Sequence, residues 1–424
     1  MVKNCSRKRP RFKVTGGATG VVNHAGSRLL ADMADATGLT GGLSVAMAPT
    51  KSRQSGWDRG DVLVDMAVSL ADGGKSFSDL AVLADQPELF GPVASVPTAW
   101  RTFEAIDGPA ASRIATARAG ARAAVWAAGA DPGFYVIDLD GTLIGSHSDK
   151  EGAAPTYKKG FGFHPIVAYL DGTGEALAGL LRPGNAGTWT AADHITVLDD
   201  ALFQIPVDPE AVEVIARVDT AGASHEFLQH CRDRRVRFVV GHPLTIDIAK
   251  ILVGRPNRVW VEAISADGTE IRENGEVTEI TGLVDLSGWP EGTRLIARRE
   301  DPHPGAQLTY TDLDGRRYQV IATDLEDDDI AYIEALYRGR GRVECSIADG
   351  KDTGMTNLPS ASFEINAAWL TCVLIAQDLT AWTQLLTLDG ELARAQPKRL
   401  RYCLFHTAAV IATSGRQRKL RLAD

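Results

Sequence analysis

Apolar residues recur at helical spacing through the early part of the chain, from about Asn23 to Ala127. Residues three or four apart share one face of a helix, so this pattern predicts amphipathic helices. No alternation typical of strands interrupts it. The apolar positions are Leu29, Leu30, Met33 and Leu39, then Val62, Met66, Ala67 and Leu70, then Leu80, Leu83 and Leu89. We therefore expect an all-helical region over residues 1–127.

From Phe134 onward the pattern changes to that of strands. Residues 134–139 predict a buried strand, and residues 161–170 and 175–181 predict a hairpin joined at the Asp-Gly-Thr-Gly turn of residues 171–174. A helix over 191–202, a strand over 212–218, a helix over 224–231 and a strand over 236–240 come next. This order of three strands, helix, strand, helix, strand is how a ribonuclease-H-like core begins.

Residues from about 257 to 325 alternate like β structure and are punctuated by Asp-Gly turns. We interpret them as a β-rich insertion that precedes the last helices of the core. The expected fold class is α/β, with helices at residues 1–127 and the first part of a ribonuclease-H-like core at 128–252. The insertion then occupies 253–326, the last core helices 327–388, and a basic C-terminal segment 389–424.

Composition indicates a folded protein with a substantial core, since 44% of the 424 residues are hydrophobic. The five cysteines are scattered and include no Cys-x-x-Cys pair, which argues against a disulfide framework or a zinc ribbon. No run of about 18 uncharged apolar residues occurs, so we expect no membrane span and no signal peptide. A reducing cytoplasm fits best.

The net charge of −9 does not by itself exclude a nucleic-acid partner, because binding depends on local patches. Both ends of the chain are basic. The N-terminal stretch carries Lys3, Arg7, Lys8, Arg9, Arg11 and Lys13, and the C-terminal stretch carries Lys398, Arg399, Arg401, Arg416, Arg418, Lys419 and Arg421. These ends either grip phosphates or are solvated tails, and the sequence favours neither.

Three carboxylates far apart in the sequence are the strongest candidates for chemistry. Asp140 and Asp219 come at the ends of predicted strands. Glu344 falls on a predicted helix, and at about 100° per residue one face of that helix also carries Tyr337, Arg340 and Lys351. Carboxylates beside basic residues can hold two divalent cations against a phosphodiester. This arrangement predicts an enzyme that cuts and joins DNA.

A rival interpretation comes from the stretch VIDLDGTLI at residues 136–144. It resembles the first motif of the haloacid-dehalogenase phosphatases, in which the first aspartate, here Asp138, attacks phosphorus and the second, Asp140, is the general acid/base. Such an enzyme also needs a later acidic pair for magnesium, for which Asp327 and Asp328 are candidates. The residues after the motif predict a β-hairpin, however, where that family has a long helix.

Five ordered segments of the chain resemble a bacterial insertion-sequence DDE transposase, of the group whose type element is numbered thirteen-eighty. They begin at Lys150 (KEGAAPTYKKGFGFHPIVAYL), Leu180 (LLRPGNAGTW), Arg217 (RVDTAGASHEFL), Tyr337 (YRGRGRVECSIADGK) and Asn366 (NAAWLTCVLIAQDL). Tyr337, Arg340, Glu344 and Lys351 match the Tyr-Arg-Glu-Lys signature of that superfamily. The resemblance covers residues from about 24 to 388.

This resemblance implies that Asp140, in an Asp-x-Thr setting with Thr142, Asp219 and Glu344 are the catalytic residues and the metal ligands. Asp138 would support them without binding metal directly. The implied cofactor is Mg²⁺, two per site, with Mn²⁺ as a substitute. The implied partners are the terminal inverted repeats of an element and its target DNA, bound by at least a dimer and with the N-terminal helices contributing to binding. The expected location is the cytoplasm, in association with the nucleoid.

The DNA-contacting residues implied by position are Tyr337, Arg340 and Lys351 on the helix, with Lys158, Lys159, His164 and Arg182 on the strands and turns around it. Lys158 and Lys159 also fit a solvated hairpin rim, and Arg182 also fits a residue that only shapes its loop. Glycines at 339, 341 and 350 interrupt the predicted helix, each costing up to about 1 kcal/mol relative to alanine. Either packing around these glycines offsets their cost to the helix, or the chain is a DNA-binding relic that has lost its activity.

Overall fold

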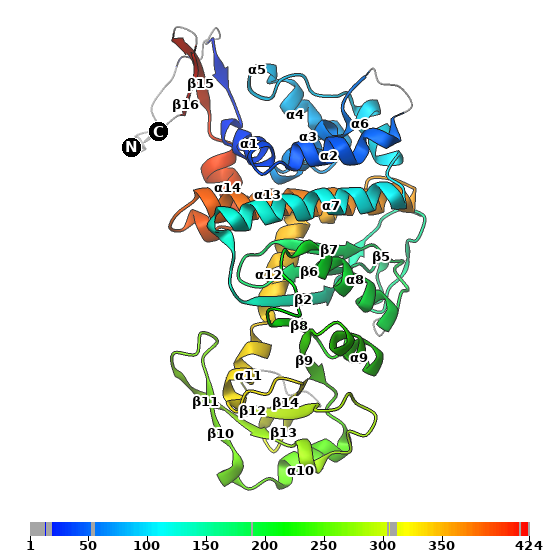
Figure 1. The fold of residues 1–424 in the computed structure, drawn as a ribbon, viewed down its shortest axis with the longest axis vertical. Coiled ribbons are helices and arrows are strands. Elements are labelled where there is room, and N and C mark those ends of the chain that lie inside the picture. The colour runs from blue at the N-terminus through cyan, green and yellow to red at the C-terminus, as the bar shows by residue number, and fades with distance from the viewer. Residues whose placement is uncertain are drawn as a thin grey trace, which may run out of the picture.

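The computed structural model describes residues 13, 19–51, 56–187, 190–302, 305, 312–414 and 417–422. Its elements form successive layers along the longest axis (Figure 1). A group of short helices lies at one end, two long helices cross beneath it, and a large mixed sheet continues to the other end. The predicted α/β class is therefore confirmed. The basic stretch of residues 3–11 and Arg416 lie outside the described residues.

The N-terminal helices follow the predicted apolar spacing. Leu30, Val62, Met66 and Leu70 are all at most 1% exposed, which places most of the predicted apolar face in the core, whereas Leu29 is 37% exposed. Phe103 packs with Phe77 and Trp369, whose ring centroids lie 4.9 and 6.1 Å away. The elements are α1 (Arg28–Ala36), α2 (Leu39–Met47), α3 (Arg59–Ala71), α4 (Ala81–Ala84), α5 (Pro87–Phe90), α6 (Val96–Glu104) and α7 (Gly108–Val125).

The middle of the chain forms the part of the sheet with strand order β7-β6-β2-β8-β9. Strands β2 (Tyr135–Gly141), β8 (Val214–Val218) and β9 (Arg237–His242) are parallel, whereas β6 (Ile166–Leu170) and β7 (Ala176–Leu180) form an antiparallel hairpin beside β2. Helices α8 (Ala191–Gln204) and α9 (His225–Asp233) connect them. The order of strands and helices agrees with the sequence pattern, because buried Val, Ile and Ala runs mark the strands.

Two short strands between β2 and β6 were not predicted, and the strand predicted over residues 161–170 is divided into a third short strand and β6. The three short strands are β3 (Ile144–Gly145), β4 (Ala154–Pro155) and β5 (Phe161–Phe163), and they form a separate small sheet. Two or three residues per strand give too short an alternation to detect in a sequence. Gly184, in the turn after β7, approaches this sheet closely, since a Cβ there would lie 2.2 Å from the carbonyl oxygen of Gly162.

The β-rich segment continues the same sheet. Strand β14 (Arg316–Thr323) pairs antiparallel with β9, and β12 (Arg294–Glu300), β11 (Ile271–Glu279) and β10 (Val261–Ile264) come next in that order. Strand β13 (Asp312–Leu313) pairs with β14, and α10 (Ile246–Gly254) leads into the segment. The inserted strands thus extend the core sheet past β9 as one continuous hydrogen-bonded surface.

The C-terminal part departs from expectation. Helix α13 (Phe363–Thr387) lies within the predicted core helices, but the short α14 (Pro397–Leu400) and the strands β15 (Ala409–Ser414) and β16 (Gln417–Leu422) were not predicted. These two strands form a hairpin that pairs with β1 (Val21–Val22) in a three-stranded sheet. The basic residues Arg418, Lys419 and Arg421 conceal the alternation, because they occupy both faces of an exposed ribbon.

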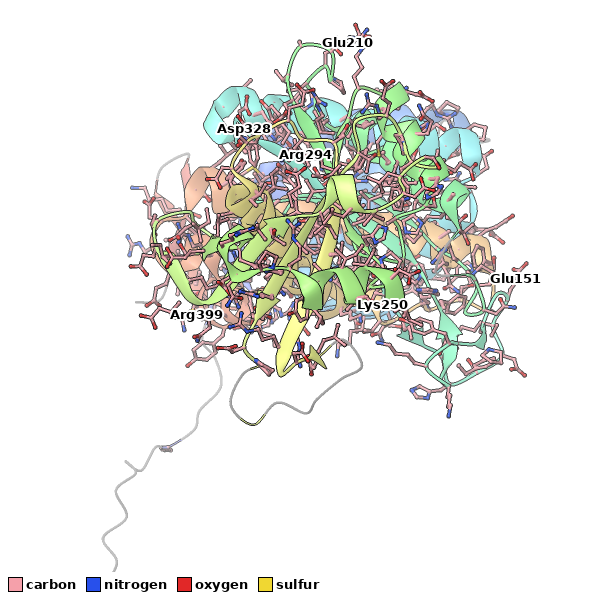
Figure 2. The ribbon with its side chains drawn as sticks, turned by 90° about the horizontal axis from the view of Figure 1, so that it is seen from below. Glu151, Glu210, Lys250, Arg294, Asp328 and Arg399 are labelled. Atoms are coloured by element: carbon pink, nitrogen blue, oxygen red, sulfur yellow. The ribbon has the colours of Figure 1, made fainter. Side chains whose placement is uncertain are left out.

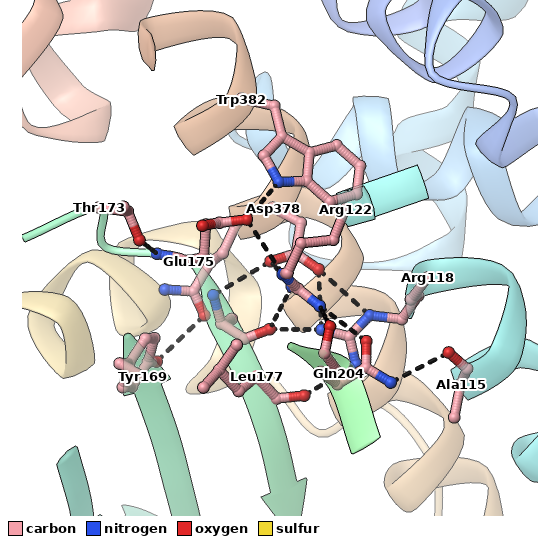
Figure 3. Close-up of polar contacts among 12 residues, drawn as sticks. Ala115, Arg118, Arg122, Tyr169, Thr173, Glu175, Leu177, Gln204, Asp378 and Trp382 are labelled. Atoms are coloured by element: carbon pink, nitrogen blue, oxygen red, sulfur yellow. Dashed lines mark hydrogen bonds and ion pairs between the residues drawn. The ribbon is translucent and has the colours of Figure 1, made fainter. Parts of the chain in front are cut away.

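A buried polar network joins the helical region to the sheet (Figure 3). Arg118 and Arg122 of α7 each donate to Asp378 of α13, at 2.8 Å, and Arg122 also pairs with Glu175 at the start of β7. The indole of Trp382 donates to Glu175 at 2.7 Å. Buried charges are tolerated only when they are paired and hydrogen-bonded, and here every carboxylate meets that condition. Helix α13 is consequently fixed between α3 and β7.

Within the described ranges, no helix is both long enough and apolar enough to cross a membrane.

Candidate active site

Asp140 and Asp219 lie at the carboxyl ends of two adjacent parallel strands. In the ladder between β2 and β8, Asp138 is opposite Arg217 and Leu139 is opposite Val218. The next pair in this register is Asp140 and Asp219, so their backbones lie about one strand spacing apart, roughly 4.8 Å. Because side chains alternate along a strand, both aspartates project to the same face of the sheet.

Asp219 also shapes the turn after β8. Its Oδ1 accepts hydrogen bonds from the backbone N–H groups of Ala221 and Gly222, at 2.9 and 3.2 Å. This is the turn-forming role that aspartate commonly has after a strand. Among the described residues no hydrogen bond to its other oxygen, Oδ2, is found. One carboxylate oxygen of Asp219 is therefore available to a ligand while the other fixes the side chain.

Glu344 comes from a helix that the chain reaches only after the inserted strands. The single helix predicted for residues 337–351 is wrong in detail: α11 (Ile330–Arg338) ends and α12 (Gly341–Gly350) begins across a turn at Gly339 and Arg340. The N–H groups of Arg340, Arg342 and Val343 bond to the carbonyl three residues earlier, which tightens the turn. Lys351 then begins a wider π-helical turn (Lys351–Met355).

Packing explains two of the three glycines in this region. A Cβ on Gly339 would lie 2.6 Å from Nη1 of Arg217 and 2.7 Å from Nη2 of Arg342, so the close approach of two guanidinium groups excludes a side chain. A Cβ on Gly350 would meet Met355 at 2.6 Å and the Gln377 side chain at 2.9 Å. Gly341, in contrast, faces open space. Close neighbours at positions 339 and 350 leave room only for glycine, and their packing offsets the cost of glycine in a helix.

Arg340 lies between the carboxylates. Its Nη1 is 3.3 Å from Oδ2 of Asp140, and its Nη2 is 3.9 Å from Oε1 of Glu344. Burial opposes its charge, yet Asp140, Tyr337, Asp219 and Glu344 together raise the pKa of Arg340 above its usual value. Side chains from β2, the β8 end and α12 therefore surround one guanidinium group, and all three predicted carboxylates lie within its electrostatic reach.

The electrostatics of Asp140 show the same convergence. Burial raises the pKa of Asp140 to about 6, Arg340 opposes the rise, and Asp219 and Glu344 add to it. Asp140 is only 16% exposed, whereas the Glu344 side chain is 72% exposed and extends into solvent. The site is thus a partly buried aspartate pair with an exposed glutamate at its rim.

Tyr337 is buried, with 4% of its surface exposed. Its hydroxyl lies against β9 and the residue after Asp219: a Cβ on Gly241 would be 2.6 Å from the Tyr337 hydroxyl and 2.5 Å from that of Thr220. Gly241 is therefore required for the tyrosine to reach the aspartate end of the sheet. Burial, with the charge of Asp219 contributing, raises the pKa of Tyr337, so its hydroxyl stays protonated.

Asp138 is held by an arginine and has no carboxylate oxygen left unpaired. Both of its oxygens accept hydrogen bonds from Arg217, each at 2.6 Å, and the two side chains are 2% and 0% exposed. Arg217 also pairs with Asp171 at 2.9 Å, and Asp171 in turn accepts from Arg342 of α12. This chain of ion pairs links β2, β8 and the end of β6 to α12, and it fixes the helix that carries Glu344.

The basic residues expected around the site divide into two groups. Lys351 lies close enough to Lys158 and Asp140 that both charges act on it; burial and Lys158 lower its pKa. Lys158 and Lys159 are exposed. Arg182 is buried, and its guanidinium donates to the carbonyls of His164 and Gly187 and to Asp193. These contacts favour a loop-shaping role for Arg182.

His164 and Thr142 lie beside Asp140 in the interior. A Cβ on Gly141 would be 3.0 Å from Nε2 of His164, while Nδ1 faces the carbonyl oxygen of Ala186 at 3.2 Å. Burial lowers the pKa of His164, so the ring is neutral at pH 7. The N–H of Thr142 donates to the carbonyl of Pro165 at 2.9 Å, which holds the end of β2 against the loop before β6.

Two residues near the site were missed by sequence reasoning. Arg217 carried a detectable signal, because it lies two residues before Asp219 and so shares its strand face, opposite Asp138. His194 of α8 carried none, since a lone histidine on a helix is usually a core residue. It is 5% exposed, and burial lowers its pKa while the nearby Asp219 charge opposes that shift.

The donor set fits a divalent cation in its chemistry. Three carboxylates and no thiol or imidazole suit hard, oxygen-preferring cations such as Mg²⁺. In the described part of the chain, however, these three do not form a ready-made group with ligand atoms at metal-binding separations. Arg340 interposes its positive charge instead, and Glu344 is exposed enough to change rotamer. Arg340 and Glu344 would have to move before the three carboxylates could share an ion.

The phosphatase interpretation does not agree with these contacts. Asp138 is held at both oxygens by Arg217, so it is not free to attack phosphorus. The acidic pair proposed for magnesium, Asp327 and Asp328, comes after β14 and acts electrostatically on Arg294 of β12 (Figure 2). Strands β8 and β9 separate β14 from β2 in the sheet.

Comparisons with known proteins agree with the transposase interpretation at the level of the family. The family described as Transposase DDE domain group 1 matches residues 2–424. No curated protein sequence matches the chain. Among solved structures, the cryo-EM structure of the piggyBac transposase synaptic complex with hairpin DNA is similar at a TM-score of 0.42, with 8% identity. The similarity covers 90% of this chain and 79% of that one. On the match over nearly its whole length, the chain belongs to the DDE transposase family, domain group 1.

Proposed function

We propose that this chain is a DNA transposase whose cleavage centre consists of Asp140, Asp219 and Glu344. The observation that carries the proposal is their convergence on Arg340 from two strand ends and a helix more than a hundred residues farther along the chain. Arg122 and Arg217 each pair with two carboxylates in the buried networks, whereas the charges of three carboxylates act on Arg340. A partly buried carboxyl group whose pKa is raised by burial and by neighbouring carboxylates, as that of Asp140 is, marks a candidate functional site.

Asp140, Asp219 and Glu344 are the residues that would hold Mg²⁺, or Mn²⁺ in its place. Two bound cations would activate the attacking water or 3′-hydroxyl and stabilise the leaving oxygen. The chain itself contributes position: Arg217 holds Asp138 and, through Asp171 and Arg342, the helix of Glu344. The turn at Asp219 leaves Oδ2 directed away from its backbone bonds.

DNA would approach from the side on which Glu344 is exposed. Arg340 and Lys351 are only partly buried, and Lys158 lies near Lys351, so three cationic side chains flank the acidic centre. Cationic side chains beside the carboxylates reduce the repulsion between those carboxylates and a phosphodiester. Tyr337 is too deeply buried to stack on a base, so its role is to position Arg340 and the end of β8.

The strand order β7-β6-β2-β8-β9, with a hairpin beside three parallel strands, supports our proposal of a ribonuclease-H-like core interrupted by strands β10–β14. We extend the proposal to an insertion-sequence element of the thirteen-eighty group in a bacterial cytoplasm, with the enzyme near the nucleoid. The DNA partners would be its terminal inverted repeats and a target, bound by a homodimer. The exposed Arg418, Lys419 and Arg421 of β16 offer a second contact to phosphates.

The test is cleavage of a supercoiled plasmid that carries the genomic sequences flanking the reading frame. We expect nicking that requires Mg²⁺ or Mn²⁺. Glu344→Gln should reduce it by more than about 100-fold, because residues that merely support metal ligands already contribute 10- to 100-fold. Glu344 is exposed, so this variant should fold normally.

Glu273→Gln is the matched control, since Glu273 is also exposed and lies on β11, far from the site. This variant should cleave at the wild-type rate. Equal nicking by Glu344→Gln and wild type would overturn the proposed centre. Retained binding to the flanking DNA without metal-dependent nicking by the wild type would instead identify a DNA-binding relic.

A further inference from the structure

A second group of potential ligands lies far from the acidic centre, at the junction of the helical region and the three-stranded sheet. It consists of His24, Asp72 and His406. One ligand atom from each residue lies within 4.8 Å of the other two. Among the described residues, this is the one group of three or more His, Cys, Asp or Glu side chains whose ligand atoms lie close enough together to hold a metal ion.

The two imidazoles approach different oxygens of the Asp72 carboxylate, and Nε2 of His406 is also 2.9 Å from the main-chain carbonyl oxygen of Asp72. Nδ1 of His24 is 2.7 Å from Oδ2 of Asp72, and Nε2 of His406 is 3.3 Å from Oδ1. Ligand atoms around a tetrahedral Zn²⁺ are separated by about 3.3 Å, given metal–ligand distances near 2.0–2.1 Å. The centroids of the two imidazole rings are 4.2 Å apart, and the ring planes are tilted by 41°. The three ligand atoms, within 4.8 Å of one another, would bind an ion once Nε2 of His406 exchanges its contact with the Asp72 carbonyl for the metal.

The backbone holds the two histidines in place independently of any ion. Ala25 donates its N–H to the carbonyl of Thr407 at 2.9 Å, next to both rings. A Cβ on Gly26 would lie 2.0 Å from the carbonyl oxygen of Leu404, so the two segments touch at a position where only glycine fits. The hydroxyl of Ser27 donates to Asp72 and orients its carboxylate. Ligands fixed in advance in this way lose little entropy on binding a metal.

We propose that His24, Asp72 and His406 form a site for a divalent transition-metal ion of the Zn²⁺ class. Two imidazoles and one carboxylate suit such an ion, whereas Mg²⁺ prefers the all-oxygen set of the cleavage centre. The His24 and His406 side chains are 28% and 39% exposed, which leaves an entry path and room for a water molecule as the fourth ligand.

The position of the site indicates what the ion would do. His24 lies just after β1, His406 precedes β15, and Asp72 ends α3 in the helical region. The ion would therefore fasten the base of the β1-β15-β16 sheet to the helices (Figure 1). Because β16 carries Arg418, Lys419 and Arg421, the site would fix the direction of this basic ribbon. This structural role does not depend on the proposed cleavage activity.

The experiment measures Zn²⁺ retained by the full chain after gel filtration, in an Asp140→Asn background that weakens the acidic centre. We expect about one Zn²⁺ per chain, and loss of it in His406→Gln and in His24→Gln. His147→Gln is the matched control, because His147 is exposed and outside the group. Added Zn²⁺ should also raise the Tm of the background protein and of the control, and not that of the other two.

A second measurement on the unsubstituted chain keeps the test valid if a variant does not fold. Zn²⁺ should protect His24 and His406 from acylation by diethyl pyrocarbonate and leave His147 reactive. The overturning result is a chain that retains no Zn²⁺ and shows no protection. The same distances would then represent a metal-free network in which both imidazoles donate hydrogen bonds to Asp72.

Discussion

At the scale of single residues, the charge balance of the candidate active site depends on Arg340. The charges of three carboxylates act on Arg340. Its contact with Asp140 at 3.3 Å limits how far burial raises the pKa of that carboxyl group. Asp140 is nonetheless left with a pKa of about 6. A carboxyl group must be ionised to bind a metal, so the proton on Asp140 competes with the cation.

Metal affinity should therefore depend on pH near neutrality. Asp140 is mostly ionised above about pH 6 and mostly protonated below it, so the apparent affinity for Mn²⁺ should be constant at pH 7–8. Below about pH 6 it should fall by about tenfold per pH unit. The electron paramagnetic resonance signal of free Mn²⁺ measures this, with Asp140→Asn as the background to subtract. An affinity that stays unchanged between pH 5 and 8 would rule out Asp140 as a ligand.

Which of these residues could be predicted from sequence depends on the kind of information each requires. Asp140 and Asp219 end strands, and strands leave a period of two in the sequence. Predicting the ion pair between Asp138 and Arg217 requires the register between β2 and β8, which no local sequence pattern contains. The deep burial of Arg182 and Tyr337 depends on neighbours from other segments, so their exposure could not be read from the motifs that contain them.

At the scale of elements, the junction between α11 and α12 determines where Glu344 points. Sequence periodicity predicted one helix, and the structure has two joined by a tight turn. The reason is tertiary: Arg217 of β8 passes over Gly339 and donates to the carbonyl of Leu336, which ends the regular helix there. Helix propensity alone cannot anticipate a contact with a strand more than a hundred residues away.

Two alanine substitutions in this junction should have opposite effects on stability. Gly339→Ala places a methyl group within 2.7 Å of two guanidinium groups and should lower the free energy of unfolding by about 1–3 kcal/mol. Gly341→Ala meets no atom within 4 Å and should raise that free energy by up to about 1 kcal/mol. Urea unfolding measures both. Equal effects of the two variants would show that Arg217 does not contact this turn.

At the scale of the whole molecule, one large sheet and the long helix α13 connect the parts of the chain. The inserted strands β10–β14 lengthen the core sheet, and α13 joins that sheet to the N-terminal helices. The order of strands and helices could be predicted from periodicity. The hairpin β15-β16 and its partner β1 could not, because short, exposed and basic strands lack the apolar alternation that marks buried ones.

The buried network on α13 should be essential to the attachment of the helical region. Asp378→Ala leaves Arg118 and Arg122 without their shared carboxylate in the interior, and should lower the free energy of unfolding by about 3–5 kcal/mol. Asp389→Ala, at an exposed position just after the same helix, should change it by less than about 0.5 kcal/mol. Thermal or denaturant unfolding separates these outcomes, and a small effect at Asp378 would contradict the assigned role of the network.

The central claim is that residues from β2, the β8 end and α12 bind one cluster of metal ions. Fe²⁺ in place of Mg²⁺, with ascorbate and peroxide, generates radicals that cut the backbone next to the bound metal. We predict cuts near Asp140, Asp219 and Glu344 together, all three suppressed by excess Mg²⁺ and all three lost in Asp140→Asn. Cuts at one or two of these segments only, or cuts that persist in Asp140→Asn, would contradict a shared metal centre.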